Sequence, residues 1–584
     1  MKILNLKRVA GITLACLMFS QPVLASEAKV SRISGSNRYK TSLKVASEIK
    51  DFDNIILASG KEFPDALSAS YLTKDGSPII LIDEKIDDAT INLVKKAKNV
   101  YLVGGESTIK KEVFESLKKI NSNIKRISGA NRFETSLKIA ESSDLNSAIL
   151  TNGLDFPDAL SAGPLSILEN SPIILTDGNK LNENHLKALK KVKKINIVGG
   201  DSSVSKDILK NLEQNIETNR ISGKNRYKTS MKVAKKFKDA NSIIIVSGKD
   251  YPDALSASGL SSKLGIPVLL SDSKLDGLSR EYLSSLGYEN IYIIGGEGSI
   301  SKDFEMDIKS LYSDERKEIY PSELKKLIDE DNVQIVDLRK KEDFENGHIP
   351  GAINMNNKEF ENPDNPIDGE IATAEQLVKL MESRGISSDK TIVVYSGAKK
   401  PQMAPRLIWT LRYYGNTTAR LLDGHFEGWE KAGYEIEKGP AKEKESTVKY
   451  SIGELNKGIN VDSDYVLNRD KNSILLDVRP TEQYEGKQES KDNKRLGHIP
   501  GALNVPYMST VAEDGYFKPA SELRKMYEAK GITKDKEIIV YCQRGHRASH
   551  TWYVLSEILG YENVKVYDGS MMEWANNDKF PIEK

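Results

Sequence analysis

The first half of this 584-residue chain repeats itself every 94 residues. The heptapeptide Arg-Ile-Ser-Gly-x-Asn-Arg occurs at residues 32–38, 126–132 and 220–226. An aromatic residue followed by Pro-Asp-Ala-Leu-Ser keeps step with it at residues 63–68, 156–161 and 251–256. A period this long is that of a small domain, because solenoid repeats are much shorter. The sequence therefore predicts three domain copies, at residues 30–120, 121–214 and 215–312.

Each copy alternates short apolar runs with segments of helical periodicity. In the first copy the apolar runs are residues 55–57, 79–81 and 101–103. Leu43, Ala46 and Ile49 lie at the spacing of one helix face. Runs without polar alternation are typical of strands buried on both faces. This pattern predicts α/β copies, each with a parallel sheet covered by helices.

In these landmarks the first half resembles the cell-wall-binding repeat type 2 family of Gram-positive surface proteins, over about residues 30–312. The resemblance implies one pseudo-threefold module that holds the protein non-covalently on an anionic wall polymer. Three weak sites on one rigid body would gain avidity. Arg38, Arg132 and Arg226 are the candidates for contact with phosphate or carboxylate groups. The alternative is that these arginines pair with aspartates and lock the copies together.

The first 25 residues have the pattern of a secretory signal. Three basic residues among the first eight precede the mostly apolar residues 9–19, and Val-Leu-Ala ends at Ala25. No later stretch has the ~18 apolar residues of a membrane span. Cleavage after Ala25 would leave two more acidic than basic residues, which argues against nucleic-acid binding. We therefore expect an exported protein that has no membrane span and does not bind nucleic acid.

The second half of the chain contains a further repeat. Residues 335–339 and 347–352 match residues 475–479 and 497–502, and residues 393–396 match residues 539–542. Residues 438–448 are charged and lack apolar rhythm, as expected for a linker. The sequence predicts two α/β domains, at residues 318–438 and 449–584, joined by a linker at residues 439–448.

The expected mature chain keeps one cysteine, Cys542, in Tyr-Cys-Gln-Arg-Gly-His-Arg-Ala-Ser. An apolar run at residues 538–540 precedes it and an amphipathic segment at residues 548–560 follows, which predicts a tight strand-to-helix loop. Inward-pointing N–H groups and the helix N-terminus favour an anion in such a loop. Arg544 and Arg547 add full positive charges. Together these groups favour the thiolate, which is the nucleophilic form of cysteine.

In these ordered motifs the second half resembles a tandem rhodanese, the thiosulfate sulfurtransferase family, over about residues 318–584. The resemblance implies two parallel five-stranded α/β domains and a cysteine that takes sulfur from a donor such as thiosulfate. The resulting persulfide passes its sulfur to a thiol or to cyanide. Here Cys542 is the implied nucleophile, and no metal or organic cofactor is implied. The implied substrate-binding residues are Gln543, Arg544, Gly545, His546 and Arg547.

The first of the two domains has lost the cysteine. Ser396 stands in its place, and Pro401 follows within the loop that should cradle an anion. A serine hydroxyl with no adjacent base is a poor nucleophile. We therefore expect this domain to be inert and to pack against the second.

The identity of the natural sulfur donor stays open, because the sequence lacks one arginine that binds it in other members. In vertebrate members an arginine that binds the donor anion lies six residues after the strand aspartate, and counting from Asp477 that place is Gln483. Arg479 lies nearby and either contacts the substrate or pairs with a carboxylate such as Glu482. No histidine pair has zinc-ligand spacing supported by further ligands, so no metal site is expected.

Three other functions compete with sulfur transfer. Tyrosine phosphatases use Cys-x5-Arg, whereas Cys542 and Arg547 form the shorter Cys-x4-Arg. A redox sensor needs a resolving thiol, which the mature chain lacks. The third is a non-catalytic surface, adhesion or S-layer-associated protein whose rhodanese pair only binds something. A pure binding protein gives no reason to keep the cysteine in one loop when the equivalent loop has lost it. We therefore expect a wall-held sulfurtransferase on a Gram-positive cell, with a wall polymer, a sulfur-containing anion and an acceptor as partners.

Overall fold

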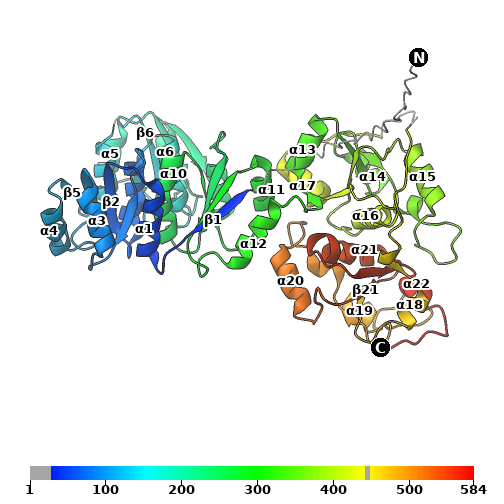
Figure 1. Ribbon diagram of the computed structural model, residues 1–584. Helices are drawn as coiled ribbons and strands as arrows, with labels where there is room; N and C mark the ends of the chain where they lie inside the picture. The colour runs from blue at the N-terminus through cyan, green and yellow to red at the C-terminus, as the bar shows by residue number, and fades with distance from the viewer. Residues whose placement is uncertain (1–27, 144, 441–447) are drawn as a thin grey trace, which may run out of the picture.

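The computed structural model describes residues 28–143, 145–440 and 448–584. The expected signal at residues 1–25 lies outside the described residues, as do residues 441–447 of the expected linker. The described chain forms two α/β bodies joined side by side (Figure 1). We call residues 28–312 the repeat module and residues 318–584 the tandem pair. Within the described part, no helix is both long and apolar enough to cross a membrane.

Three four-stranded parallel sheets make up the described repeat module. Their strands are β1 (Lys29–Ile33), β2 (Asn54–Ser59), β3 (Ile79–Ile82), β4 (Asn99–Val103), β5 (Ile124–Ile127), β6 (Ser147–Asn152), β7 (Ile173–Thr176), β8 (Lys194–Val198), β9 (Glu217–Ile221), β10 (Ser242–Ser247), β11 (Val268–Ser271) and β12 (Asn290–Ile294). The sheet orders are β3-β2-β4-β5, β7-β6-β8-β9 and β11-β10-β12-β1.

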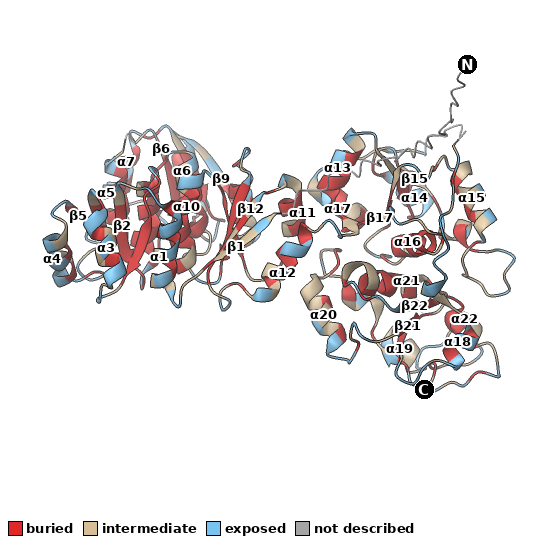
Figure 2. Cartoon of the chain, in the orientation of Figure 1, coloured by how far each residue is buried: buried red, intermediate tan, exposed pale blue. Residues whose placement is uncertain are grey.

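Helices cover these sheets and leave the strands in the interior (Figure 2). They are α1 (Arg38–Ile49), α2 (Phe63–Ser68), α3 (Asp88–Lys96), α4 (Lys111–Ile120), α5 (Arg132–Glu141), α6 (Ala162–Leu168), α7 (Glu183–Leu189), α8 (Lys206–Glu213), α9 (Arg226–Ala234), α10 (Pro252–Leu264), α11 (Gly277–Leu286) and α12 (Lys302–Leu311). The asparagine of each heptapeptide caps α1, α5 or α9 by accepting backbone N–H groups, which satisfies donors that a helix end leaves free.

The fourth strand of each sheet comes from another copy. β5 opens the second copy but completes the first sheet, and β9 completes the second sheet in the same way. β1 pairs with β12, so the start of the first copy completes the third sheet. The first arginine of each heptapeptide secures this exchange by donating to a double-glycine carbonyl. These bonds join Arg32 to Gly295, Arg126 to Gly104 and Arg220 to Gly199, at 2.8, 2.8 and 2.7 Å.

Three aromatic rings meet where the three copies converge. Phe63, Phe156 and Tyr251, the aromatic residues of the second motif, have ring centroids 5.8 to 5.9 Å apart in every pairing. Tilted and edge-to-face pairs at this distance are favourable beyond their burial. The second motif therefore lies on the pseudo-threefold axis, and the exchanged strands close the module into a ring.

The tandem pair contains two five-stranded parallel sheets of the same order. The first is β13-β17-β16-β14-β15, built from β13 (Glu318–Ile319), β14 (Val333–Asp337), β15 (Ile353–Asn354), β16 (Thr391–Tyr395) and β17 (Arg420–Leu422). The second is β18-β22-β21-β19-β20, built from β18 (Asn460–Val461), β19 (Ile474–Asp477), β20 (Leu503–Asn504), β21 (Ile538–Tyr541) and β22 (Val564–Tyr567). The parallel α/β fold predicted for both halves of the chain is confirmed.

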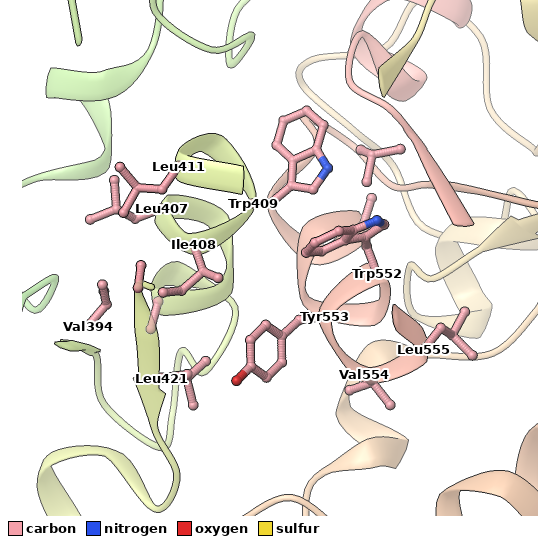
Figure 3. Packing of buried hydrophobic residues seen from close by; sticks show 14 of the residues in the cluster. Val394, Leu407, Ile408, Trp409, Leu411, Leu421, Trp552, Tyr553, Val554 and Leu555 are labelled. Carbon is pink, nitrogen blue, oxygen red and sulfur yellow. The ribbon is translucent and has the colours of Figure 1, made fainter. Parts of the chain in front are cut away.

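Helices flank both sheets of the tandem pair. The first domain has α13 (Pro321–Asp329), α14 (Lys341–Asn346), α15 (Ala374–Ser383), α16 (Met403–Tyr413) and α17 (His425–Ala432). The second has α18 (Ser463–Leu467), α19 (Thr481–Tyr484), α20 (Ala520–Glu528), α21 (His546–Tyr553) and α22 (Ser570–Trp574). Figure 3 shows α16 and α21 facing each other, with Trp409, Trp552 and Tyr553 between the domains. One apolar cluster spans both domains, so the two cores form a single unit.

The tandem pair is attached to the repeat module through α11 and α12 (Figure 1). Arg280 of α11 forms a buried ion pair with Asp423 of the first domain, at 3.3 Å. The ring of Tyr516, from the second domain, lies between Gly277 and Gly424, where any side chain would overlap it. The junction therefore binds the module to both domains.

Candidate functional site

Cys542 lies at the carboxyl end of β21, the central strand of the second sheet in the tandem pair. The chain turns directly after it into α21, which is the strand, loop and helix order predicted from the sequence. Ligands of open parallel sheets bind outside the carboxyl ends of the strands. The cysteine is only 1% exposed, so its sulfur lies at the bottom of the loop.

A serine at the start of α22 holds the two ends of the cysteine loop together. Its hydroxyl, Ser570 Oγ, accepts the N–H of Cys542 at 3.1 Å and that of Gly545 at 3.3 Å. Within the described residues, no acceptor contacts the N–H groups of Gln543 and Arg544. Two donors therefore remain for an anion between the fixed ends. Sequence analysis missed Ser570, although aligning Asp-Gly-Ser here with Asp-Gly-His in the first domain would have shown the difference.

Gly545 lets the loop turn tightly against the first domain. Its φ of +74° is one that side chains disfavour, and a Cβ there would overlap the carboxylate of Asp568. Asp568 forms an ion pair with Arg406 of α16 at 2.6 Å, and both side chains are buried. Arg406 also donates to the carbonyl oxygen of Gly369 at 2.7 Å. The first domain thus forms the floor beneath the loop.

The two loop arginines have different partners. Arg547 donates to the neutral amide oxygen of Gln483 at 3.2 Å. Arg544 lies between two carboxylates, with Nε 3.1 Å from Asp368 and Nη2 2.9 Å from Asp492. Opposite charges this close offset one another. Arg547 therefore supplies a positive charge that no described carboxylate pairs with, whereas the charge of Arg544 is compensated twice.

Arg479 lies behind the loop. Its side chain is 2% exposed, and its Nη2 contacts Asp477 at 2.6 Å and the carbonyl oxygen of Gly497 at 2.8 Å. Burial alone would lower the pKa of Arg479, but Asp477 raises it above its usual value. The carboxylate partner is therefore Asp477 and not Glu482. The charge of Arg479 is therefore compensated by Asp477, and its donors are directed at the protein.

A ten-residue insertion in the second domain reaches the cysteine loop. The stretch from Asp477 to Gly497 is ten residues longer than its counterpart in the first domain. Asn493, within this insertion, exchanges amide hydrogen bonds with Gln543. Arg495 anchors the insertion by donating to backbone carbonyl oxygens near the end of the chain. The insertion therefore holds the exposed side of the loop.

His546 and Tyr507 complete the surroundings of the cysteine. His546 Nε2 lies 3.0 Å from the carboxylate of Glu361 in the first domain. Burial raises the pKa of Tyr507, while Arg547 lowers it and Cys542 raises it, which places the phenol close to both groups. Sequence analysis missed Tyr507, since no motif signals a contact between positions so far apart.

The equivalent loop of the first domain lines a cavity of about 650 Å³ but has partners of its own. Ser396 Oγ donates to the carbonyl oxygen of Lys400 at 3.2 Å, and His425 Nδ1 lies 3.4 Å away. The expectation that no base lies beside this serine is therefore wrong. Burial lowers the pKa of His425 to about 4, so the imidazole is neutral at pH 7. The carboxylate of Glu427 accepts the N–H of Ala398 at 2.9 Å, which places a negative charge where an anion would otherwise bind.

The three arginines expected to contact the wall polymer occupy equivalent places in the repeat module. Each donates from Nη1 to a glycine carbonyl oxygen of its own copy, joining Arg38 to Gly60, Arg132 to Gly153 and Arg226 to Gly248 at 2.8, 3.0 and 2.7 Å. Arg38 also lies over the ring of Tyr251 in the third copy and 3.4 Å from Asp250. A cavity of about 240 Å³ adjoins Arg38 at this boundary between copies.

Comparison with known families divides the chain in the same way as its repeats. The cell wall binding domain 2 family matches residues 32–114, 126–209 and 220–305. The rhodanese-like domain family matches residues 320–432 and 463–577. The repeats of the first family point to the cell wall or cell surface.

Individual relatives and solved structures are similar to parts of this chain. The sulfur carrier protein TtuD of Thermus thermophilus is 37% identical over 257 residues, which are 41% of this chain and 87% of that protein. A putative thiosulfate sulfurtransferase of Mycolicibacterium smegmatis is 36% identical over 246 residues, with 41% and 87% covered. Cwp8 from Clostridium difficile is 28% identical, with a TM-score of 0.45, over 49% of this chain and 53% of that one. The 3-mercaptopyruvate sulfurtransferase SseA from Escherichia coli is 30% identical, with a TM-score of 0.39, over 44% and 98%. The chain belongs to the rhodanese-like sulfurtransferases, as a tandem rhodanese pair preceded by three cell wall binding domain 2 repeats.

Proposed function

We propose that this protein is a wall-held enzyme that transfers sulfane sulfur through a persulfide on Cys542. The observation that carries the proposal is the cysteine loop itself. Its ends are held by Ser570, two of its N–H groups have no acceptor among the described residues, and Arg547 adds a charge. Such a cradle suits a small sulfur-containing anion such as thiosulfate.

The proposed reaction has two half-reactions at one sulfur atom. The thiolate of Cys542 attacks the outer sulfur of thiosulfate, the S–S bond breaks, and its electron pair leaves with sulfite. A persulfide remains on the cysteine. An acceptor thiolate or cyanide then attacks the terminal sulfur, takes it as a persulfide or as thiocyanate, and regenerates the thiolate. Two successive displacements at one nucleophile predict ping-pong kinetics.

The roles of the remaining residues follow from their partners. Arg547 and the N–H groups of Gln543 and Arg544 bind the donor anion and stabilise the departing sulfite. Gly545 and His546 shape the loop, and Arg479 supports the structure behind it through its ion pair with Asp477. The Ser396 loop of the first domain has no part in the chemistry, because it lacks the cysteine and Glu427 already accepts the N–H of Ala398.

The test is mass spectrometry of the intact protein after incubation with thiosulfate. We expect a gain of one sulfur, about 32 Da, on Cys542. Cyanide should then remove this mass as thiocyanate, and Cys542→Ser should show neither event. Equal thiocyanate release by Cys542→Ser would contradict the proposal. If the wild-type protein gains no mass from any sulfane donor, the tandem pair is a binding module.

We further propose that the repeat module holds the enzyme on an anionic polymer of a Gram-positive wall. The support is three equivalent arginines on one closed ring, which would give avidity. Substituting Arg38, Arg132 and Arg226 together by glutamine should release the protein from purified walls, while single substitutions should weaken retention. Sulfur transfer should be unchanged in all of them. Undiminished sedimentation of the folded triple variant with walls would show that other residues bind the polymer.

A further inference from the structure

The first domain, although it lacks the cysteine, places a loop directly on the cysteine loop of the second domain. This loop, residues 356–371, begins with a short 3-10 turn at Asn357–Phe360. Gly369 approaches the backbone of Arg544 so closely that a side chain at Gly369, where φ is +102°, would overlap it. The N–H of Ile371 donates to Asp568 at 3.1 Å. The 356–371 loop therefore forms one wall of the active site.

Glu361 makes the most direct contact of this loop with the active site. Its side chain is 5% exposed, and Oε1 lies 3.0 Å from His546 Nε2. A carboxylate only accepts, so Nε2 of His546 must carry the proton and donate it. Lys358 holds the other oxygen of Glu361 at 2.8 Å. Burial alone would raise the pKa of Glu361, but the bonds from His546 and Lys358 lower it to about 2. The carboxylate is therefore charged at any working pH.

His546 transmits this contact to the cysteine loop. It is the first residue of α21, and its N–H donates to the carbonyl oxygen of Arg544 at 3.0 Å, closing the turn after Cys542. Arg544 is held from the same side by Asp368 and from the other by Asp492. The cysteine loop, two of whose N–H groups have no acceptor in the described part of the chain, is therefore fixed by side chains of both domains.

The two domains of the tandem pair are related by a pseudo-twofold axis. Comparing them shows that Glu361 has no acidic counterpart at the matching position of the second domain. An isolated bridge pairs Glu361 with Ile371 in the first domain, and the matching bridge in the second domain pairs Val511 with Phe517. Val511 is thus the counterpart of Glu361, in the loop that faces the Ser396 loop. At this position a charged side chain therefore occurs only in the loop that faces the cysteine.

We propose that Glu361 of the cysteine-free domain is a positioning residue for sulfur transfer, acting through His546 on the cysteine loop. The inference rests on the proposed function, because it assigns Glu361 a role in that reaction. It also gives the inert domain a task, which is to set the geometry of its partner's anion cradle. Misplacing reacting groups by about 1 Å can cost about 100-fold in rate.

The experiment compares the full-length variants Glu361→Ala, Glu361→Gln and Asp364→Ala with the wild type. Asp364 is the matched control, because it is exposed in the same loop and its carboxylate accepts a hydrogen bond from Gln376 at 3.3 Å. We expect Glu361→Ala to lower kcat/KM for thiosulfate about tenfold or more. Glu361→Gln should restore most of the loss, because its amide oxygen still accepts from His546, and Asp364→Ala should match the wild type.

Amide hydrogen exchange separates this inference from the proposed function. In Glu361→Ala, exchange should speed up at residues 542–547 and stay unchanged in β16, the central strand of the first domain. This measurement does not require sulfur transfer, so it decides the role of Glu361 even if the wild type proves inactive with every donor. The inference is overturned if Glu361→Ala matches Asp364→Ala in exchange at the loop. In an active enzyme, failure of Glu361→Gln to recover activity would also overturn it.

Discussion

At the scale of single residues, the sequence could not assign different roles to Arg544 and Arg547, the two arginines of the cysteine loop. Both were expected to bind the donor anion, because both follow the cysteine within five positions. In the structure, two carboxylates from different parts of the chain compensate Arg544, and a neutral amide accepts from Arg547. Long-range partners decide the role of a charged side chain, and spacing along the sequence contains no record of them.

This difference predicts unequal effects of two matched substitutions. Arg547→Gln should raise the KM for thiosulfate about tenfold or more, because a charge-assisted hydrogen bond contributes about 1.5–3 kcal/mol. Arg544→Gln should change KM less, because Asp368 and Asp492 already offset the charge that it removes. Steady-state kinetics of the two variants at equal salt concentration would measure the ratio. A larger rise in KM for Arg544→Gln would contradict this assignment of roles.

The counterpart loop shows a second limit of the sequence. Ser396 was matched with Cys542 because both follow a strand of the same apolar pattern, and in the structure both residues directly follow the central strand of their sheet. His425 was not expected beside it, since 29 residues separate the two in the chain. The contact of Glu427 with the N–H of Ala398 was missed for the same reason.

At the scale of elements, local patterns were sufficient for most of the architecture. Apolar runs predicted the parallel strands, and the heptapeptide recurred with a regular spacing because it builds one strand-to-helix connection three times. The exchange of β1, β5 and β9 between copies could not be seen this way. A strand at the edge of a repeat has the same pattern whether it pairs within its own copy or with the next.

The cysteine loop combines a predictable part with an unpredictable one. Its position between β21 and α21 follows from periodicity, and its glycine follows from the turn. Its shape depends on Ser570, Glu361 and the ten-residue insertion, which approach from three other elements. The site is therefore assembled by packing, and the sequence reveals only its nucleophile and nearest neighbours.

At the scale of the whole molecule, the repeat module and the tandem pair share a buried polar junction. Arg280 of α11 contacts Asp423, and Tyr516 fills a space that requires glycine at positions 277 and 424. Glu281, the next residue on α11, accepts the N–H of Ser322 at 3.1 Å. A surface this specific fixes the orientation of the cysteine loop relative to the repeat module.

Glu281 should make this junction sensitive to pH. Burial raises the pKa of Glu281 to about 7, although hydrogen bonds from Ser322 lower it. In the unfolded chain a glutamate titrates near 4.3. The folded state therefore binds a proton that the unfolded state releases between these values. The contribution of Glu281 to the free energy of unfolding is therefore largest below about pH 4. It declines as the pH rises toward 7 and is lost above that value.

Glu281→Gln should remove this dependence, because an amide stays neutral throughout. We expect the variant to exceed the wild type in stability by about 1–3 kcal/mol at pH 8, since the wild type must there keep a buried charge. The difference should shrink at pH 5, where the wild-type carboxyl is protonated. Calorimetric unfolding of the full chain at the two pH values measures it, with Glu297→Gln as an exposed control in the same repeat. An equal shift in Tm at pH 5 and pH 8 would show that Glu281 does not titrate at the junction.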